Sequence, residues 1–356
     1  MWTRFFQEEL PQSWIGACPD YPCQLTSNRT LLTQADAVVF HIRDMYDFSH
    51  IPNQKTRRPN QRYVFFLLES PHHTGPLRNL DKIPGFFNWT MTFRLDSDIP
   101  IPYGYVEHQP FDVQEAIKPE YNDYKRRWLN STNDGNKLTR ERILDIVQKK
   151  QYDIVWFVSN CYTPSRRESY VESIRKFPNV SLHTYGQCGW NNCSVRQRLQ
   201  CDTITESRYW FYIAAENSNC HQYVTEKFWS RAHLASIPIV LDRRIYENAN
   251  VPNRSFIAIS DFDSVQSLIK YLRYLQNNID EYMSYFNWRL PPAQIPFVSP
   301  LTTAGRKYGF CLLCRQLWNM SSPVRIIRNL SKWWFSKGDC NESYATPPQI
   351  WNKLKL

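Results

Sequence analysis

Residues 211–241, FYIAAENSNCHQYVTEKFWSRAHLASIPIVL, decide the fold. The apolar run at 211–215 predicts a β-strand that ends at Glu216, and a polar loop follows it. Residues 224–235 carry apolar side chains at helical spacing and predict a helix, and residues 237–241 predict a second buried strand. A strand, a loop, a helix and a strand in this order form one unit of a parallel α/β sheet. Such sheets bind ligands beyond the carboxyl ends of their strands.

The start of the predicted helix has an unusual charge pattern. Thr225 is a suitable N-cap and Glu226 complements the helix dipole, but Lys227 opposes it. The lysine is accommodated if an anion binds at the same helix start, because the backbone N–H groups there already favour a phosphate. A solvated surface lysine is the alternative interpretation, and this feature alone leaves both open.

Length and charge limit the class of protein. The chain has 356 residues and a formal net charge of +10. The length predicts two domains. The positive charge is spread along the sequence, which suits a small anionic substrate such as a nucleotide sugar. A nucleic-acid binder is disfavoured because the chain has neither a basic run nor a motif of base-stacking aromatic residues.

Cysteines and sequons indicate the compartment. Ten cysteines and nine N-x-S/T sequons are typical of an oxidising, glycosylating lumen. We expect Asn88 to be buried in a tightly patterned segment and unoccupied. The other eight are predicted N-glycosylation sites: Asn28, Asn130, Asn179, Asn192, Asn253, Asn319, Asn329 and Asn341. The sequence has no run of eighteen apolar residues, and its first residues lack the apolar core of a signal peptide.

A carboxylate ends another predicted strand. Residues 61–69, QRYVFFLLE, form an apolar run that ends on Glu69, and Ser70-Pro71 turns the chain there. The carboxyl end of a strand is where α/β folds place ligands. The alternative is that Glu69 caps the following turn.

A pair of arginines follows another predicted strand. Residues 154–159, IVWFVS, predict a buried strand, and Arg166 and Arg167 begin a helix that extends to about residue 176. Arginines at a helix start oppose the dipole, but an arginine fork on a diphosphate removes the conflict. A surface arginine is the alternative for whichever of the two is not used.

Asp96-Ser97-Asp98 matches the D-x-D pattern of manganese-dependent transferases. This short motif is weak evidence by itself for a metal site. It lies within residues 86–105, FFNWTMTFRLDSDIPIPYGY.

The remaining elements are predicted from shorter patterns. We expect strands at 35–42, 180–189 and 255–259, helices at 138–149 and 264–277, a loop at 242–251 and a helical tail at 296–356. The tail has basic and aromatic side chains, which predict a membrane-surface segment, a partner-binding segment or a solvated helix edge. These side chains are Trp333, Trp334, Lys337, Trp351, Lys353 and Lys355.

Several of these motifs together resemble one enzyme family. ENSNCHQYVTEKFW at 216–229 is similar to the donor-binding signature of the GDP-fucose-dependent α1,3/4-fucosyltransferases, and residues 86–105 resemble their acceptor-side segment. The resemblance implies an α/β protein of the GT-B type, with two Rossmann-like domains facing each other across a cleft. We assign residues 1–135 to the acceptor-side domain, 136–152 to a linker, 153–295 to the GDP-fucose-binding domain, and 296–356 to a helical tail that returns to the first domain.

The resemblance also implies roles for the motif residues. Glu69 matches the proposed general base. Glu226 would also stabilise positive charge on the sugar in the transition state. The residues implied in donor binding are Arg167, Asn217, Tyr223, Glu226 and Lys227. Arg167 is favoured over Arg166 by the alignment of the pattern R-E-S-Y-V-E-S-I.

Two closely spaced cysteine pairs lie near the two ends of the chain. Cys18 and Cys23, with Cys311 and Cys314, are compatible with zinc, but an oxidising lumen favours disulfides. The resemblance implies the bonds Cys18–Cys311 and Cys23–Cys314, which would tie the tail to the first domain. We further expect Cys161–Cys188 and Cys193–Cys201. The pairing of Cys220 and Cys340 is left open.

The implied activity is inverting transfer of L-fucose from GDP-β-L-fucose to the 3-OH of a GlcNAc in a glycoprotein or glycolipid glycan. No tightly bound metal is required, although Mn²⁺ can stimulate the reaction. The family implies the Golgi lumen and an N-terminal membrane anchor. Because the sequence shows no anchor, we expect a catalytic domain without it or an incomplete gene model. The alternative function is a catalytically inactive lumenal carbohydrate-binding protein on the same fold.

Overall fold

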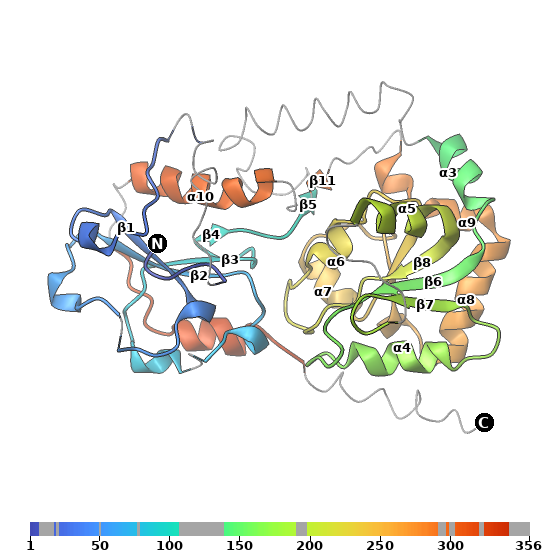
Figure 1. Cartoon of the computed structure of the whole chain (residues 1–356), viewed down its shortest axis with the longest axis horizontal. Coiled ribbons are helices and arrows are strands. Elements are labelled where there is room, and N and C mark those ends of the chain that lie inside the picture. Colours follow the sequence, from blue (N-terminus) through green and yellow to red (C-terminus); the bar gives the residue numbers. More distant parts are fainter. Residues whose placement is uncertain are drawn as a thin grey trace.

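Two separate parallel β-sheets, each accompanied by helices, form the body of the molecule (Figure 1). The computed structural model describes residues 1–6, 18, 21–49, 51–76, 79–106, 139–189, 198–290, 297–298, 303–319 and 324–341. A short antiparallel pair joins β5 (Tyr105–Val106) to β11 (Phe297–Val298). The two parallel sheets confirm the predicted α/β class with two Rossmann-like domains.

The first sheet has the strand order β1-β2-β3-β4, and all of its pairs are parallel. Its strands are β1 (Ala37–His41), β2 (Arg62–Leu67), β3 (Trp89–Thr92) and β4 (Ile99–Pro100). Every residue of β2 is buried, as expected for a central strand of a parallel sheet that is covered on both faces. The strands predicted at 35–42 and 61–69 are confirmed, each shortened at its ends.

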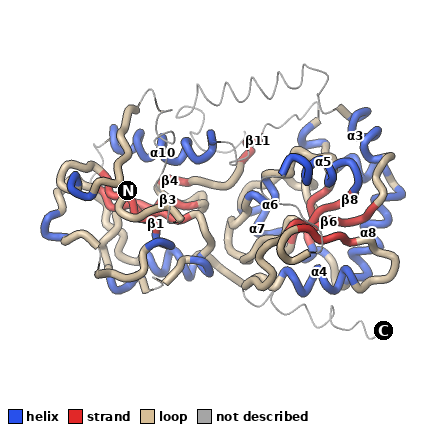
Figure 2. Tube along the Cα trace, in the orientation of Figure 1, coloured by secondary structure: helices blue, strands red, loops and turns tan. Residues whose placement is uncertain are grey.

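The C-terminal part of the chain covers both faces of this sheet. On one face, Phe310 and Leu313 of α10 (Thr303–Trp318) belong to the same apolar cluster as Phe66 of β2. On the other face, Trp334 belongs to the cluster that contains Phe65. Figure 2 shows α10 lying over the first sheet, far from its sequence neighbours in the second domain. The predicted return of the tail to the first domain is confirmed for the described residues.

The second sheet has the order β10-β9-β8-β6-β7, again with parallel pairs. Its strands are β6 (Tyr152–Phe157), β7 (Leu182–Tyr185), β8 (Tyr209–Ile213), β9 (Ile237–Val240) and β10 (Ile257–Ala258). The chain runs from β6 outward to β7 and then crosses to the other side of β6 as β8. Strand order therefore reverses between β6 and β8, which is where doubly wound sheets bind ligands.

Helices connect the strands of the second domain. They are α3 (Arg140–Val147), α4 (Arg167–Arg175), α5 (Arg198–Arg208), α6 (Glu226–Trp229), α7 (Arg243–Asn248), α8 (Val265–Asn277) and α9 (Ile279–Ser284). α8 is amphipathic, and its buried Leu268 and Leu272 pack in the same cluster as Ile154 of β6. α3, α4 and α8 confirm three predicted helices, with bounds shifted by a few residues.

Two predictions about local structure in this domain are wrong. The helix predicted at 224–235 is only the single helical turn α6. After α6 the backbone continues in i to i+3 hydrogen-bonded turns, such as the bond from the Leu234 N–H to Arg231 O. The loop predicted at 242–251 contains α7. The side chain of Asp242 caps α7 by accepting a hydrogen bond from the Arg244 N–H, a capping signal that the prediction overlooked. The strand predicted at 255–259 is reduced to the two residues of β10.

The predicted exposure of the tail is wrong for Trp334. Its side chain is fully buried, with its ring edge-on to Phe65 and Phe93 and its indole N–H donated to Thr74 Oγ1 at 2.8 Å. Neither a membrane-surface segment nor a solvated edge describes this residue. The predicted tail residues Trp351, Lys353 and Lys355 lie outside the described residues.

Disulfides join segments that are distant in sequence. Cys18 is bonded to Cys311 and Cys23 to Cys314, the pairs implied by the resemblance, so these thiols are not zinc ligands. Cys161 is bonded to Cys188, as expected. The two cysteines whose pairing was left open, Cys220 and Cys340, are bonded to each other. Cys201 is disulfide-bonded, and its expected partner Cys193 lies outside the described residues.

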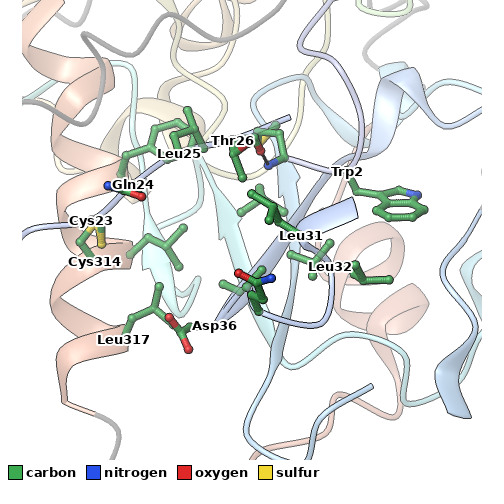
Figure 3. Close-up of a pocket in the computed structure, with 18 of the residues that line it drawn as sticks. Trp2, Cys23, Gln24, Leu25, Thr26, Leu31, Leu32, Asp36, Cys314 and Leu317 are labelled. Carbon is green, nitrogen blue, oxygen red and sulfur yellow. Dashed lines mark hydrogen bonds between the residues drawn. A yellow bond between two sulfur atoms is a disulfide. The ribbon is translucent and has the colours of Figure 1, made fainter. Parts of the chain in front are cut away.

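Figure 3 shows a cavity of about 690 Å³ beside the Cys23–Cys314 bond. It lies between α10 and the segment before β1, with Leu31 and Leu317 among its apolar lining residues. This cavity belongs to the first domain and contains none of the residues that the sequence assigned to chemistry.

The sequons differ in exposure. Asn88 is buried, as expected: its carbonyl oxygen accepts the Tyr63 N–H, and its amide donates to Arg325 O. Asn341 is half-buried. The remaining sequons among the described residues are exposed: Asn28, Asn179, Asn253, Asn319 and Asn329. Asn130 and Asn192 lie outside the described residues, and glycosylation itself stays a prediction.

None of the helices described is both long enough and apolar enough to cross a lipid bilayer.

Candidate active site

The sequence-assigned residues meet where loops leave the carboxyl ends of three strands. Arg167 follows β6, the segment from Glu216 to Lys227 follows β8, and Glu69 follows β2 of the first domain. The first two loops flank the point where strand order reverses in the second sheet.

Glu216 is the buried centre of the β8 loop. Its carboxylate accepts the backbone N–H and the hydroxyl of Thr225, both at 2.7 Å, and lies 3.2 Å from Lys227 Nζ. Burial raises the pKa of the Glu216 carboxyl, and the Lys227 ammonium opposes that shift. Thr225 holds the N-cap position of α6 as predicted, but its hydroxyl binds Glu216 and makes no cap bond. Sequence reasoning missed Glu216, although it begins the quoted signature.

Lys227 lies between two carboxylates. Its Nζ is 3.0 Å from Glu226 Oε1 and donates to Thr225 Oγ1 at 2.9 Å. Burial favours the neutral amine, but Glu216 and Glu226 outweigh it and raise the pKa of Lys227. The side chain therefore stays an ammonium ion, and the interpretation as a simply solvated lysine is wrong. Burial opposes ionisation of Glu226, whose carboxyl pKa is nevertheless lowered by Lys227.

Arg167, which follows β6, contacts the start of the β8 loop. It is 3% exposed, and its two Nη atoms donate to Ala215 O at 2.8 Å and to Asn160 O at 3.0 Å. Burial lowers the pKa of Arg167, and Glu216 is first among the carboxylates that oppose this shift. Arg166 is exposed and occupies the left-handed N-cap position with φ 48°. The structure thus places Arg167, the residue that the alignment favoured, against the β8 loop.

Three buried polar atoms in these loops lack hydrogen-bond partners among the described residues. They are Arg167 Nε, Asn217 Oδ1 and Asn219 Nδ2. Buried polar atoms in folded proteins are normally bonded, because leaving one unsatisfied costs free energy. Such atoms beside two cations are expected of a site that binds a polar, anionic ligand.

Glu69 meets the β8 loop from the opposite domain. The hydroxyl of Tyr223 donates to Glu69 Oε2 at 3.2 Å. Burial, followed by Tyr103 and Glu69, raises the pKa of Tyr223 well above its ordinary value, so the hydroxyl keeps its proton and remains a donor. The turn after Glu69 has Ser70 at its N-cap position with no side-chain cap bond, so the alternative role of Glu69 as a turn cap is wrong.

A second contact between the domains lies next to this one and was missed by the sequence analysis. Ser70 Oγ donates to Ser218 Oγ at 2.8 Å, and His73 Nδ1 is 3.1 Å from each of the two hydroxyls. Both serines are fully buried. They follow Glu69 and Asn217 directly, so this cluster fixes the two loops that carry the assigned residues.

Gln222 attaches the β8 loop to both domains. Its side-chain oxygen accepts the Leu95 N–H at 2.8 Å, and its amide donates to Asn248 O at 3.0 Å. Gln222 has φ 60°, and Cys220 two residues earlier is bonded to Cys340. Two hydrogen bonds and one disulfide therefore fix the β8 loop, and no local sequence signal indicated these three contacts.

The D-x-D carboxylates have partners within the fold. Asp98 Oδ2 accepts the backbone N–H and the hydroxyl of Thr90, both at 2.8 Å, and Asp96 is paired with Arg94 at 2.7 Å. These carboxylates fix the start of β3 and the turn before β4. In the described residues, His72 lies near Cys220 and Cys340, but the bond between the two cysteines removes them as metal ligands.

Two cations on one domain and a carboxylate contributed by the other suit transfer of a group from an anionic leaving group to a hydroxyl. On two Rossmann-like domains, this arrangement defines a glycosyltransferase. Residues 147–333 match the family model of glycosyltransferase family 10 (fucosyltransferase), C-terminal part, and residues 1–104 match the fucosyltransferase N-terminal model. The chain belongs to glycosyltransferase family 10 and is a fucosyltransferase.

Named relatives from several animals are similar over most of the chain. It is 34% identical over 339 residues to alpha-(1,3)-fucosyltransferase fut-1 of Caenorhabditis elegans, covering 92% of this chain and 70% of the relative. It is 32% identical to alpha-(1,3)-fucosyltransferase C of Drosophila melanogaster, covering 94% and 77%. It is 32% identical to human 4-galactosyl-N-acetylglucosaminide 3-alpha-L-fucosyltransferase FUT6, covering 87% and 75%.

A solved structure of an alpha1,3-fucosyltransferase with GDP-fucose aligns at 15% identity and a TM-score of 0.43, covering 76% of this chain and 78% of that one.

Proposed function

We propose that this fucosyltransferase moves L-fucose from GDP-β-L-fucose to the 3-OH of a GlcNAc in a glycoprotein or glycolipid glycan, with inversion at the anomeric carbon. The observation that carries the proposal is the hydrogen bond between Tyr223 and Glu69. It brings a carboxylate of the first domain to the cation-bearing loop of the second. The names of the relatives, which specify α1,3 transfer, support the same linkage.

Arg167 and Lys227 bind the diphosphate of the donor. A diphosphate gains negative charge as its bond to fucose breaks, so fixed cations beside it stabilise the transition state more than the bound donor. Lys227 already holds its charge against the Glu216 and Glu226 carboxylates. Binding of the diphosphate then adds a third anionic partner at the start of α6.

Asn217, Tyr223 and Glu226 surround the ribose and the fucose ring. The unpartnered Asn217 Oδ1 is available to accept a hydrogen bond from a sugar hydroxyl. The carboxyl pKa of Glu226 is lowered by Lys227, so this side chain carries a negative charge at neutral pH. That charge stabilises an oxocarbenium-like sugar in the transition state.

Glu69 acts as the general base. Its carboxylate takes the proton of the acceptor 3-OH while the oxygen attacks the anomeric carbon from the face opposite the diphosphate. The bond from carbon to phosphate oxygen breaks, and GDP leaves with the electron pair. A β-linked donor thereby gives an α-linked product. Proton transfer by a positioned carboxylate contributes typically about 10²–10⁴-fold.

The reaction needs no resident metal, although Mn²⁺ can stimulate it. The support is that Asp96 and Asp98 are occupied by Arg94 and Thr90. Two fixed cations supply the charge that a metal provides in other transferases. Activity that is permanently lost on removal of divalent ions would contradict this part of the proposal.

We place the enzyme in the Golgi lumen as a type II membrane protein held by an N-terminal anchor. The disulfides and the exposed sequons support an oxidising, glycosylating compartment. Its partners are GDP-fucose and glycan acceptors.

The deciding experiment is transfer of labelled fucose from GDP-fucose to a panel of acceptors. The panel contains N-acetyllactosamine, LacdiNAc and an N-glycan core, and product linkage is determined by NMR. We expect α1,3-linked fucose on GlcNAc with the unchanged chain and a loss of at least about 10²-fold with Glu69→Gln. Sugar binding without transfer to any acceptor and without donor hydrolysis would favour the inactive carbohydrate-binding protein instead.

A further inference from the structure

We infer that Tyr223 is a positioning residue for the reaction: its hydroxyl orients the Glu69 carboxylate across the domain boundary. The proposed base is therefore correctly oriented only when the β8 loop, which carries Tyr223, is in place. The inference rests on the proposed function, because it assigns to Tyr223 an action on the proposed base. It goes beyond the donor contact that the family resemblance implied for this residue.

The direct contact is a single hydrogen bond with a defined direction. Tyr223 donates to Glu69 Oε2 at 3.2 Å, and within the described residues it is the one hydrogen-bond donor to this carboxylate. An ionised carboxylate accepts at both of its oxygens. A donor fixed on Oε2 sets the rotation of the carboxylate plane and leaves Oε1 to accept the proton of the sugar hydroxyl.

The tyrosine ring itself has little freedom to move. It is 2% exposed, and its centroid lies 4.9 Å from Phe93 in an edge-to-face arrangement and 6.3 Å from Tyr103. Phe93 and Tyr103 belong to the first domain, whereas Tyr223 belongs to the loop after β8. The ring of a donor-domain residue is thus packed in a slot of the acceptor-side domain.

The backbone on both sides of Tyr223 is fixed as well. The Tyr223 N–H donates to Cys220 O at 3.0 Å, and Cys220 is bonded to Cys340. Gln222 joins Leu95 on one domain to Asn248 on the other. A hydroxyl held by so many constraints can impose its geometry on Glu69, which a mobile side chain could not do.

The charged and titratable groups around this contact come from both domains. Tyr223 is acted on by Glu69 and Tyr103 of the first domain and by Glu216 and Glu226 of the second. Displacement of the β8 loop would remove the hydrogen bond from Glu69 without changing any residue of the first domain.

The test is a double-mutant cycle of Tyr223→Phe and Glu69→Gln in the full chain. Transfer to N-acetyllactosamine is measured at saturating GDP-fucose. We expect Tyr223→Phe to lower kcat by about tenfold when Glu69 is present. In the Glu69→Gln background the same substitution should change the residual kcat little, because the hydroxyl acts through the carboxylate.

The matched control is Tyr103→Phe. The Tyr103 hydroxyl donates to Leu68 O at 3.0 Å, so the control removes a hydroxyl that bonds to the backbone carbonyl of the residue before Glu69. We expect Tyr103→Phe to change kcat by the same factor with and without the Glu69→Gln substitution. Circular dichroism and thermal unfolding of both variants show that each is folded.

The outcomes separate this inference from the function on which it rests. If Glu69→Gln loses turnover but Tyr223→Phe lowers kcat by the same factor in both backgrounds, Tyr223 does not position the base, while the proposed mechanism stands. An equal coupling of Tyr103→Phe to Glu69→Gln would show a general loosening of the site and would also overturn the inference. If Glu69→Gln transfers fucose at a near-normal rate, the proposed base is wrong and Tyr223 has no role of this kind.

Discussion

Gly104 of the first domain lies directly under the indole of Trp229 in the second, so close that a β-carbon on Gly104 would overlap the ring. Trp229 is 1% exposed and ends α6, the single helical turn that begins with Glu226 and Lys227. The absence of a side chain at Gly104 therefore sets how closely the two domains approach each other beside the β8 loop.

Gly104→Ala is expected to destabilise the protein by about 1–3 kcal/mol, the usual cost of overpacking a filled site. Because α6 must shift to make room, GDP should also bind more weakly. Urea denaturation and calorimetry measure the two effects. Adding Trp229→Phe supplies a smaller ring, and the double variant should recover part of both losses. If Gly104→Ala alone leaves stability and GDP affinity unchanged, the contact does not set the distance between the domains.

Lys227→Met is expected to weaken GDP and GDP-fucose binding together. The variant removes one of the two cations that we propose to bind the diphosphate. It also leaves the buried Glu216 carboxylate without its ion pair, a change that typically costs about 3–5 kcal/mol. Calorimetry with GDP and urea denaturation measure these losses. Lys176→Met is the matched control, since Lys176 is 75% exposed and pairs with Glu172. An unchanged GDP affinity in Lys227→Met would remove this residue from the phosphate site.

The pH dependence of stability should reveal Glu216. Burial raises the carboxyl pKa of Glu216 above its ordinary value of 4.5, so the folded state binds more protons than the unfolded state in the pH window above 4.5. Its contribution to the free energy of unfolding is therefore present at low pH and is lost as the pH rises through that window. Glu216→Gln does not titrate, so its stability should decline less over the same pH range. Urea titrations at several pH values give the two slopes, and parallel slopes would contradict the prediction.

Trp334→Ala should destabilise the first domain although the residue lies in the C-terminal segment. The variant removes a fully buried indole and its bond to Thr74, and loss of a large aromatic core residue costs about 3–5 kcal/mol. Hydrogen exchange should become faster in β2, against which the indole packs. Trp318→Ala is the control, because Trp318 is 60% exposed. Equal effects of the two substitutions would mean that the burial of Trp334 contributes little.

Much of the fold follows from local sequence patterns. The runs that became β2 and β8 are apolar or aromatic without alternation, apart from Arg62 at the start of β2, because parallel strands are covered on both faces. Arg167 was favoured over Arg166 from a motif, and the burial of Arg167 agrees with that choice.

The features that were missed depend on contacts between distant segments. Glu216 was overlooked because a glutamate after a strand is common, and only its burial against Thr225 and Lys227 makes it central. No local pattern pairs Cys220 with Cys340, 120 residues apart. The exposure predicted for Trp334 failed because a basic, aromatic segment looks alike on a surface and in a domain contact.

The coverage of the first sheet by α10 and Trp334 has a consequence for biosynthesis. Strands β1 to β4 are made early, but the side chains that cover their two faces are made only near the end of the chain. During synthesis on the ribosome, the apolar faces of the first sheet therefore remain uncovered while the whole second domain is synthesised and folds. Premature stop codons that remove only this C-terminal segment should therefore be more harmful than its small size implies, because they leave the first sheet, at the opposite end of the polypeptide, exposed on both faces.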